Sequence, residues 1–377
     1  MKSTLSNFDI LVISDIHFGN GRVSAIRTYE RLQQQVYPLV DKIKLLIICG
    51  DTFDTLLNMN SDAGWYVAKF IDDIIVLCQH YNVYLRVVRG TFSHDRHQNR
   101  FFTVKNKGEL KLNNKPLVKV LDRISVEHFD DLNLSVLYCP DDQPHQDMNQ
   151  AIIDVIKANH LDAVDLMCSH GYYEHLLPPG IPHVPHNTLS YSKLNKYVSG
   201  MMVNGHVHRS GVYENKVISI GSFERFEFGN EFPVGMWMLH VKADGIKKKW
   251  SYEFLENKNS LIFKTFVVAK YNNPESLCAA ITEFMNERRE SDEPTYVRIM
   301  GDAIDGISGW IKDTFEHVIV SDKRTTIVQP ILEEDIKVDT DELPIITEDN
   351  LPKMVFDKLS DNSGMTYEEV EKIINEL

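Results

Sequence analysis

The chain has 377 residues, of which 43% are hydrophobic and 25% charged, a composition typical of globular proteins and unlike that of disordered or fibrous ones. Its length is enough for about two domains. Because no apolar run approaches the roughly 18 residues that a membrane span needs, we expect no transmembrane segment. The first residues show no apolar signal region and no cleavage site, and we expect no membrane partner. The cysteine pattern is typical of a cytoplasmic protein.

The charge is unevenly distributed along the chain. The 40 basic and 54 acidic side chains give a net charge of −14, and residues 333–377 hold 14 of the acids but only 4 of the bases. Residues 96–121 show the opposite pattern, with seven basic side chains against Glu109 alone. Such a stretch can follow a phosphate backbone, although from charge alone a solvated loop and hairpin is the simpler interpretation.

The first 170 residues alternate short apolar runs with longer amphipathic stretches. The short runs are typical of buried strands and lie at residues 8–14, 45–49, 83–88, 134–138 and 166–168. Residues 23–42 and 62–81 repeat apolar side chains every three or four positions, which predicts helices. This alternation predicts a layered α/β core.

The sequence after Gly200 becomes rich in predicted strands. These lie at residues 201–203, 217–220, 235–241 and 249–254. A second unit begins near Ser260 and is predicted as strand, helix, strand, helix, strand at residues 261–269, 274–289, 296–300, 304–315 and 317–320. Residues 339–363 are acidic, and we interpret them as a linker before an amphipathic helix at 366–377.

The five cysteines indicate reduced thiols. They are widely spaced, odd in number and mostly inside apolar runs, unlike a disulfide framework. They are Cys49, Cys78, Cys139, Cys168 and Cys278.

Aspartate or histidine follows the end of five separate predicted strands. In chain order these side chains are Asp15 and His17, Asp51, His94 and Asp95, His170, and His206 and His208. The carboxyl ends of the strands are where ligands bind in an open α/β sheet. Carboxylate together with imidazole suits manganese, iron or zinc better than magnesium or calcium. The co-occurrence therefore predicts a metal centre.

This order of motifs resembles the calcineurin-like metallophosphoesterases, whose signature runs Asp-X-His, Gly-Asp-X-X-Asp, Gly-Asn-His-Asp, His and Gly-His-X-His. The resemblance covers residues 8–255 and implies an α/β fold, a four-layer α/β/β/α sandwich, with two divalent metal ions. It implies that the first metal is held by Asp15, His17, Asp51 and His208. Asp51 would bridge to the second, which His170 and His206 complete. His94 would donate a proton to the leaving oxygen, and Asp95 would orient it.

One position departs from this family. The asparagine that ligates the second metal stands just before the histidine, and this chain has Ser93 there, in Gly90-Thr91-Phe92-Ser93-His94-Asp95. A hydroxyl is a weaker ligand than an amide carbonyl. Either Ser93 binds directly or through water, or the second metal is held loosely. Whether Thr91 substitutes for the asparagine stays open.

A narrower resemblance comes from residues 221–231. Gly221-Ser222-Phe223-Glu224-Arg225, with Phe228-Gly229 and Glu231 after it, is similar to the segment that follows Gly-His-X-His in the SbcD-type DNA repair nucleases. These are the prokaryotic and phage counterparts of the eukaryotic meiotic-recombination nuclease. The resemblance implies manganese-dependent cleavage of DNA, as exonuclease on duplex ends and endonuclease on single strands.

The same resemblance implies a domain organisation and partners. A nuclease domain at residues 1–258 would be followed by a small α/β capping domain at 259–332. Residues 333–377, an acidic linker and C-terminal helix, would contact an SbcC-type coiled-coil ATPase, and the protein would be a homodimer. Candidate DNA contacts are Arg96, Arg100, Lys105, Lys107 and Arg225.

Two other functions stay open. The same core serves small-substrate phosphomonoesterases and phosphodiesterases, because specificity lies in loops and caps. A non-catalytic scaffold of this fold is the third hypothesis, and only Ser93 favours it. The C-terminal helix could equally pack against its own domain.

Overall fold

The computed structural model describes residues 7–106, 110–141, 147–176, 188–244, 247–288, 292–302 and 304–324. The predicted acidic linker and C-terminal helix at 333–377 lie outside these residues. Within the described part of the chain, no helix is both long enough and apolar enough to cross a membrane. All five cysteines are free, and four of them are buried, as the sequence predicts.

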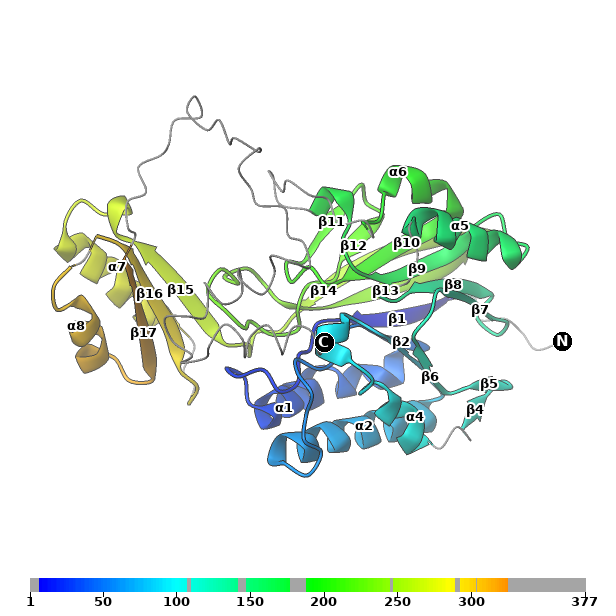
Figure 1. The fold of residues 1–377 in the computed structure, drawn as a ribbon, viewed down its shortest axis with the longest axis horizontal. Coiled ribbons are helices and arrows are strands. Elements are labelled where there is room, and N and C mark those ends of the chain that lie inside the picture. The colour runs from blue at the N-terminus through cyan, green and yellow to red at the C-terminus, as the bar shows by residue number, and fades with distance from the viewer. Residues whose placement is uncertain are drawn as a thin grey trace, which may run out of the picture. The chain divides into compact units, whose positions relative to one another are not determined.

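The first of two six-stranded sheets has the strand order β14-β13-β1-β2-β3-β6 (Figure 1). Its strands β1, β2, β3 and β6 run parallel, whereas β13 pairs antiparallel with β1 and with β14. The strands are β1 (Asn7–Ile13), β2 (Leu45–Cys49), β3 (Tyr84–Val88), β6 (Val118–Leu121), β13 (Gly235–Asp244) and β14 (Lys247–Glu256). A small hairpin of β4 (Lys111–Leu112) and β5 (Lys115–Pro116) precedes β6.

The second sheet has the order β11-β12-β10-β9-β8-β7. Its four central strands run parallel, and the two edge strands are antiparallel to their neighbours. The strands are β7 (Ser125–Phe129), β8 (Leu134–Cys139), β9 (Val164–His170), β10 (Val198–Gly205), β11 (Gly211–Tyr213) and β12 (Val217–Ser219). Both sheets therefore have a parallel centre whose strands end at one edge.

Alternation of side chains along the strands builds four layers. In β1, Ile10 and Val12 pack against the second sheet, whereas Leu11 and Ile13 point the opposite way and pack against helices. Figure 1 shows α1 (Ala25–Gln35) and α2 (Asp62–Tyr81) on one side of the paired sheets, and α5 (Met148–Ala158) and α6 (Tyr191–Leu194) on the other. Apolar side chains of α5 and α6 cover the outer face of the second sheet.

The remaining helices of this part are short. They are α3 (Phe92–Asp95), α4 (Arg100–Asn106) and the 3-10 turns η1 (Tyr37–Lys42), η2 (Glu174–Leu176) and η3 (Asn195–Tyr197). The helix predicted over 23–42 is split into α1 and η1, because Pro38 lacks the N–H and clashes with a continuing α-helix.

Helix α5 is absent from the predicted elements. Its signal is the four-residue spacing of Met148, Ile152 and Ile156, all buried, with Asp147 as the cap. The Asp147 side chain accepts hydrogen bonds from the backbone N–H groups of Asn149 and Gln150.

The last described part is a small α/β unit with its own core. Its parallel strands are β15 (Ile262–Val267), β16 (Thr295–Gly301) and β17 (Val318–Arg324), in that order. Helices α7 (Pro274–Glu287) and α8 (Ile307–Thr314) pack on one face, and η4 (Val268–Lys270) follows β15. The predicted fold class, an α/β sandwich, is confirmed, and a small α/β unit follows it.

A buried arginine on α1 ties the sandwich to the α/β unit. Arg31 Nη1 lies 2.9 Å from Glu224 Oε2, and Arg31 Nη2 contacts the carboxylate of Glu293, shortly before β16. Arg31 is 4% exposed and Glu224 0%. Burial raises the pKa of Glu224 to about 7, and the charge of Arg31 limits the rise.

Replacing Arg31 with methionine is expected to destabilise the protein by about 3–5 kcal/mol near pH 8, because buried Glu224 must then either stay charged without its partner or take up a proton that the unfolded chain does not bind at this pH. The loss should shrink toward pH 5, since the folded-state pKa of Glu224 lies well above the unfolded value of 4.5 and its carboxyl group is protonated there. For the same reason, the stability of the wild type should fall as the pH rises from 4.5 to about 7.

Urea unfolding at both pH values measures these effects. Arg27→Met on the same helix is the matched control, because Arg27 pairs with Glu30 at the surface and its loss should cost less than about 1 kcal/mol. An equal loss for Arg31→Met at both pH values would contradict the role assigned to Glu224.

Candidate active site

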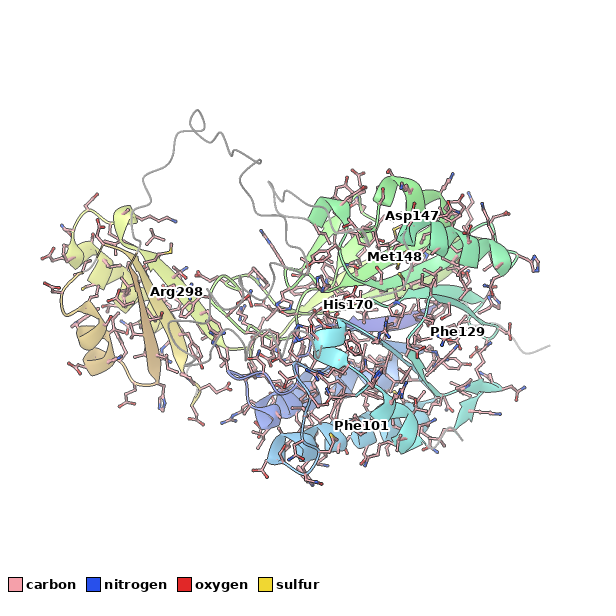
Figure 2. All side chains as sticks on the ribbon, in the orientation of Figure 1. Phe101, Phe129, Asp147, Met148, His170 and Arg298 are labelled. Carbon is pink, nitrogen blue, oxygen red and sulfur yellow. The ribbon has the colours of Figure 1, made fainter. Side chains whose placement is uncertain are left out.

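The carboxyl ends of strands from both sheets carry the polar side chains of the site. Asp15 and His17 follow β1, Asp51 follows β2, and residues 90–95 follow β3 in the first sheet. In the second sheet, His170 ends β9 (Figure 2), and His206 and His208 follow β10. The structure therefore gathers side chains that lie up to about 190 residues apart in the chain.

The first group of side chains that could hold a cation is Asp15, His17 and His208. The Nε2 atoms of His17 and His208 lie 3.1 Å apart. They lie 3.8 Å and 3.6 Å from Asp15 Oδ1. Asp15 is held in place because its Oδ2 accepts a hydrogen bond from the backbone N–H of His206.

The second group, which shares no residue with the first, is Asp51, His170 and His206, whereas His17 also lies in a group with Asp54 and His94. His170 Nε2 lies 3.3 Å from Asp51 Oδ2, and the same oxygen lies 4.0 Å from His17 Nε2 in the first group. One carboxylate, that of Asp51, thus reaches both groups.

Hydrogen bonds on the far side of the imidazole rings fix which nitrogen can bind a cation. His170 Nδ1 lies 2.7 Å from the carbonyl oxygen of Cys49, which can only accept, so Nδ1 carries the proton. Its Nε2 then faces Asp51 Oδ2 and is the nitrogen that would bind a cation. His17 Nδ1 lies 3.1 Å from Asp54 Oδ1, a close contact between an imidazole and a carboxylate. Histidines that bind metals are oriented by such partners.

Unfilled bonding capacity also fits a cation. Asp15 Oδ1 and His170 Nε2 are buried and have no hydrogen-bond partner within the described residues. Burial lowers the pKa of His170, but the facing Asp51 carboxylate outweighs it and raises that pKa to about 10. Burial raises the pKa of Asp51, but the imidazole of His170 outweighs it and holds that pKa below its usual range. A proton therefore occupies the position that a metal ion would compete for.

Four of the gathered residues adopt left-handed backbone conformations. Their φ angles are 50° for Asp15, 52° for His17, 47° for Asp51 and 79° for His206. Such conformations are uncommon in non-glycine residues and cluster at functional sites, where the surrounding structure enforces them. Gly50, at φ 91°, permits the tight turn, because a Cβ there would lie 2.1 Å from His170 Nδ1.

The hydroxyl group at this site belongs to Thr91 and not to Ser93. Thr91 Oγ1 lies 3.2 Å from Asp51 Oδ2 and 3.3 Å from His206 Nδ1, and the Thr91 backbone N–H donates to Asp51 Oδ1 at 2.6 Å. Ser93 is exposed on the single turn of α3. This chain has two more residues in the loop than the family's motif. A helical turn accommodates them, and His94 therefore still lies at the site.

Asp95 does not contact His94 in the way that the family resemblance implies. His94 Nδ1 lies 2.7 Å from the backbone carbonyl of Asp54, so this carbonyl, and not Asp95, orients the His94 ring. Asp95 is fully buried and accepts hydrogen bonds from Phe53 N, Gly90 N and Asn99 Nδ2, at 3.1, 2.7 and 2.7 Å. Burial, with the charge of Asp51, raises its pKa to about 6. Asp95 therefore joins the loops that follow β2 and β3.

Asp54 belongs to the site although no role is predicted for it from sequence. Its carboxylate faces His17 and its carbonyl faces His94, so it positions two rings. Burial raises the pKa of Asp54, but His17 outweighs it and the pKa lies below its usual value. The sequence feature that could have identified Asp54 is its position as the last residue of the Gly-Asp-X-X-Asp motif.

The predicted DNA contacts differ in their surroundings. Arg96 and Arg100 are exposed, Lys105 pairs with Asp72 at 2.8 Å, and Lys107 lies outside the described residues. Arg225 is a correction: its guanidinium donates to the carbonyls of Phe232 and Leu261 at 2.9 and 3.3 Å. Its side chain is 15% exposed, so it fastens the start of the α/β unit and is not free to follow a nucleic acid.

Comparisons with known proteins find similarity only among solved structures. No family model matches the chain, and no curated protein matches it in sequence. Nuclease MPE of Pseudomonas putida is 16% identical, with 61% of this chain and 83% of that one covered and a TM-score of 0.26. A cold-active protein-tyrosine phosphatase of a psychrophilic Shewanella is 15% identical, with 68% and 82% covered and a TM-score of 0.31.

A third similar structure is TT1561 of Thermus thermophilus. It is 8% identical, with 65% of this chain and 98% of that one covered and a TM-score of 0.37. Because all three TM-scores lie below 0.5, function has to be argued from the geometry of the site itself.

Asp95→Ala is expected to lower stability by more than about 3 kcal/mol, because it leaves the buried N–H groups of Phe53 and Gly90 without acceptors. Chemical denaturation measures the loss. Ser93→Ala is the control, with a change within about 0.5 kcal/mol, since its side chain is exposed. If Asp95 acted only through His94, its replacement would reduce activity and leave stability unchanged.

Proposed function

We propose that the protein is a metal-dependent phosphodiesterase of the calcineurin-like type and, more narrowly, a DNA nuclease of the SbcD type. The observation that carries the proposal is the position of the Asp51 carboxylate between the two groups of histidines. A carboxylate shared by two nitrogen-rich groups is the arrangement that two neighbouring divalent cations need. Manganese is the expected metal.

The ligand sets follow from the distances. Asp15, His17 and His208, together with Asp51, would hold one cation. The ligands of the second cation would be Asp51, His170 and His206, with the Thr91 hydroxyl in place of the predicted Ser93. Two bound cations lower the pKa of water and stabilise negative charge on phosphoryl oxygens.

His94 is placed to move a proton. The Asp54 carbonyl keeps a proton on Nδ1, which leaves Nε2 as the exchanging nitrogen. The His94 ring lies edge-on to that of His17, with 4.8 Å between their centroids, so it adjoins the first ligand group. In this position Nε2 would protonate the leaving oxygen of the ester.

Resemblance alone supports the finer parts of the proposal. These are DNA repair or recombination as the role, an SbcC-type ATPase and a second copy of the chain as partners, and the cytoplasm as the location. The small α/β unit and the exposed Arg96 and Arg100 support a polynucleotide substrate. A small phosphate ester remains the alternative substrate, and a cleavage assay separates the two.

Gel-resolved cleavage of end-labelled duplex and single-stranded DNA in Mn²⁺ tests the function. Asp51→Asn should abolish cleavage, and His94→Gln should reduce it by roughly 10²–10⁴-fold while duplex binding is kept. His128→Gln is the matched control, because His128 is an exposed histidine on β7 and should leave cleavage unchanged. If the protein hydrolyses a small phosphate ester but cleaves no DNA, the proposed function is wrong and a phosphatase activity takes its place.

The Thr91 hydroxyl can be tested by metal binding alone. In calorimetric titration with Mn²⁺, Thr91→Val should weaken one of the two binding events about 10-fold or more, and Thr91→Asn should strengthen the same event. Ser93→Ala should match the wild type. Weaker binding in Ser93→Ala with normal binding in Thr91→Val would return the ligand role to Ser93.

A further inference from the structure

A cavity of about 60 Å³ is lined by residues that come just before and just after the loop carrying Thr91 and His94. Three arginines line it, Arg89, Arg96 and Arg100, together with His97, Asn99 and Asp122. None of these side chains belongs to the two groups that would hold the cations. The three guanidinium groups against one carboxylate make the lining cationic, unlike the carboxylate-rich centre beside it.

The cavity opens at the same edge of the first sheet as the metal-site residues. Arg89 directly follows β3 and Asp122 directly follows β6, which are neighbouring parallel strands beyond β2. Because adjacent strands lie about 4.8 Å apart, the cavity lies one to two strand spacings from the end of β2, on the order of 5–10 Å. Asp51 follows that end.

Hydrogen bonds join the cavity to the catalytic loop. Asn99 donates through Nδ2 to Asp95 Oδ2, which also accepts from the backbone N–H of Gly90. Arg89 donates through Nη2 to the carbonyl of Asp141 at 2.8 Å, which fixes its place in the wall. Arg96 and Arg100 line the cavity and are also exposed to solvent.

The cavity offers acceptors as well as donors. Asn99 is 3% exposed, and its Oδ1 has no hydrogen-bond partner within the described residues. Since a buried oxygen of this kind demands a donor, the ligand has to bring a hydroxyl group or a water molecule beside its negative charge. Planar guanidinium groups match the oxygens of a phosphate in pairs. The internal sugars of a DNA strand carry no free hydroxyl group, so a DNA phosphate meets both requirements together with a water molecule that donates to Asn99 Oδ1.

An exposed aromatic ring contacts the wall of the cavity. Phe92, between Thr91 and Ser93 on the loop, is 46% exposed. Its ring meets that of His97 in the cavity wall edge-on, at 5.5 Å between centroids. Exposed aromatic rings beside cationic grooves are where successive bases of a single strand stack.

We propose that this cavity binds a phosphate of a polynucleotide strand next to the phosphate that is cleaved, with the intervening base on Phe92. The inference rests on the proposed function and makes it more specific, because it selects a polymer over a small phosphate ester. A monoester fills only the metal centre, whereas a strand fills the centre and the cavity together.

Binding without cleavage tests the cavity directly. Fluorescence anisotropy of a labelled single-stranded oligonucleotide of about 12 nucleotides is measured in EDTA across a series of salt concentrations. The Arg96→Gln/Arg100→Gln double variant should raise Kd by at least about 10-fold at low salt. The slope of log K against log salt should shrink by about 0.7, the amount expected for the one phosphate of a single strand that the two guanidinium groups neutralise together.

Two further variants make the result specific. Arg27→Gln/Lys69→Gln removes the same charge from the surfaces of α1 and α2, where each cation pairs with an acid, and should leave Kd and slope within about twofold of the wild type. Phe92→Leu should raise Kd without changing the slope, because stacking releases no counterions. If the Arg96→Gln/Arg100→Gln variant shows the same salt dependence of binding as the Arg27→Gln/Lys69→Gln control, the cavity proposal is wrong.

Cleavage kinetics separate this failure from that of the proposed function. With Mn²⁺ present, the double variant should raise KM for the oligonucleotide much more than it lowers kcat, as expected when uniform binding is removed. If the double variant cleaves DNA with an unchanged KM, the proposed role of the cavity is wrong and the proposed nuclease activity stands. A wild type that neither binds nor cleaves DNA yet hydrolyses a small ester overturns both.

Discussion

The backbone carbonyl of Cys49 is the point on which the site depends. It accepts hydrogen bonds from Ser14 Oγ at the end of β1 and from His170 Nδ1 at the end of β9, both at 2.7 Å. The Cys49 thiol in turn donates to the carbonyl of Ser169. Strand ends of both sheets are thereby locked together, and one buried carbonyl fixes their relative position and the tautomer of His170.

Much of this arrangement follows from sequence because strand ends obey a simple rule. Asp15, Asp51, His170 and His206 each come directly after, or at the end of, a short apolar run, and parallel strands bring such ends to one edge. The fold class follows from the same runs. Contacts made through backbone atoms leave no trace in the side-chain pattern, and the Asp54 carbonyl that orients His94 is one of them.

The loop after β3 shows where the sequence argument fails. Counting from the family's motif selects Ser93 and pairs Asp95 with His94, but one helical turn changes which side chains face the centre. That turn rotates Ser93 to solvent, brings Thr91 to Asp51 and directs Asp95 into the core. Whether four residues form a turn or an extended segment depends on tertiary contacts such as those of Asp95, and local propensity cannot decide it.

The electrostatics of the centre and the cavity are complementary. Asp15, Asp51 and Asp54 make the centre negative, so a phosphate is repelled from it until cations are bound. Arg96 and Arg100 attract a phosphate whether or not metal is present. The cavity that they line is connected to the catalytic loop by the hydrogen bonds of Asp95 with Asn99 and Gly90. A strand held first by the cavity would therefore reach the centre already oriented, and the metal ions would be needed for hydrolysis and not for capture.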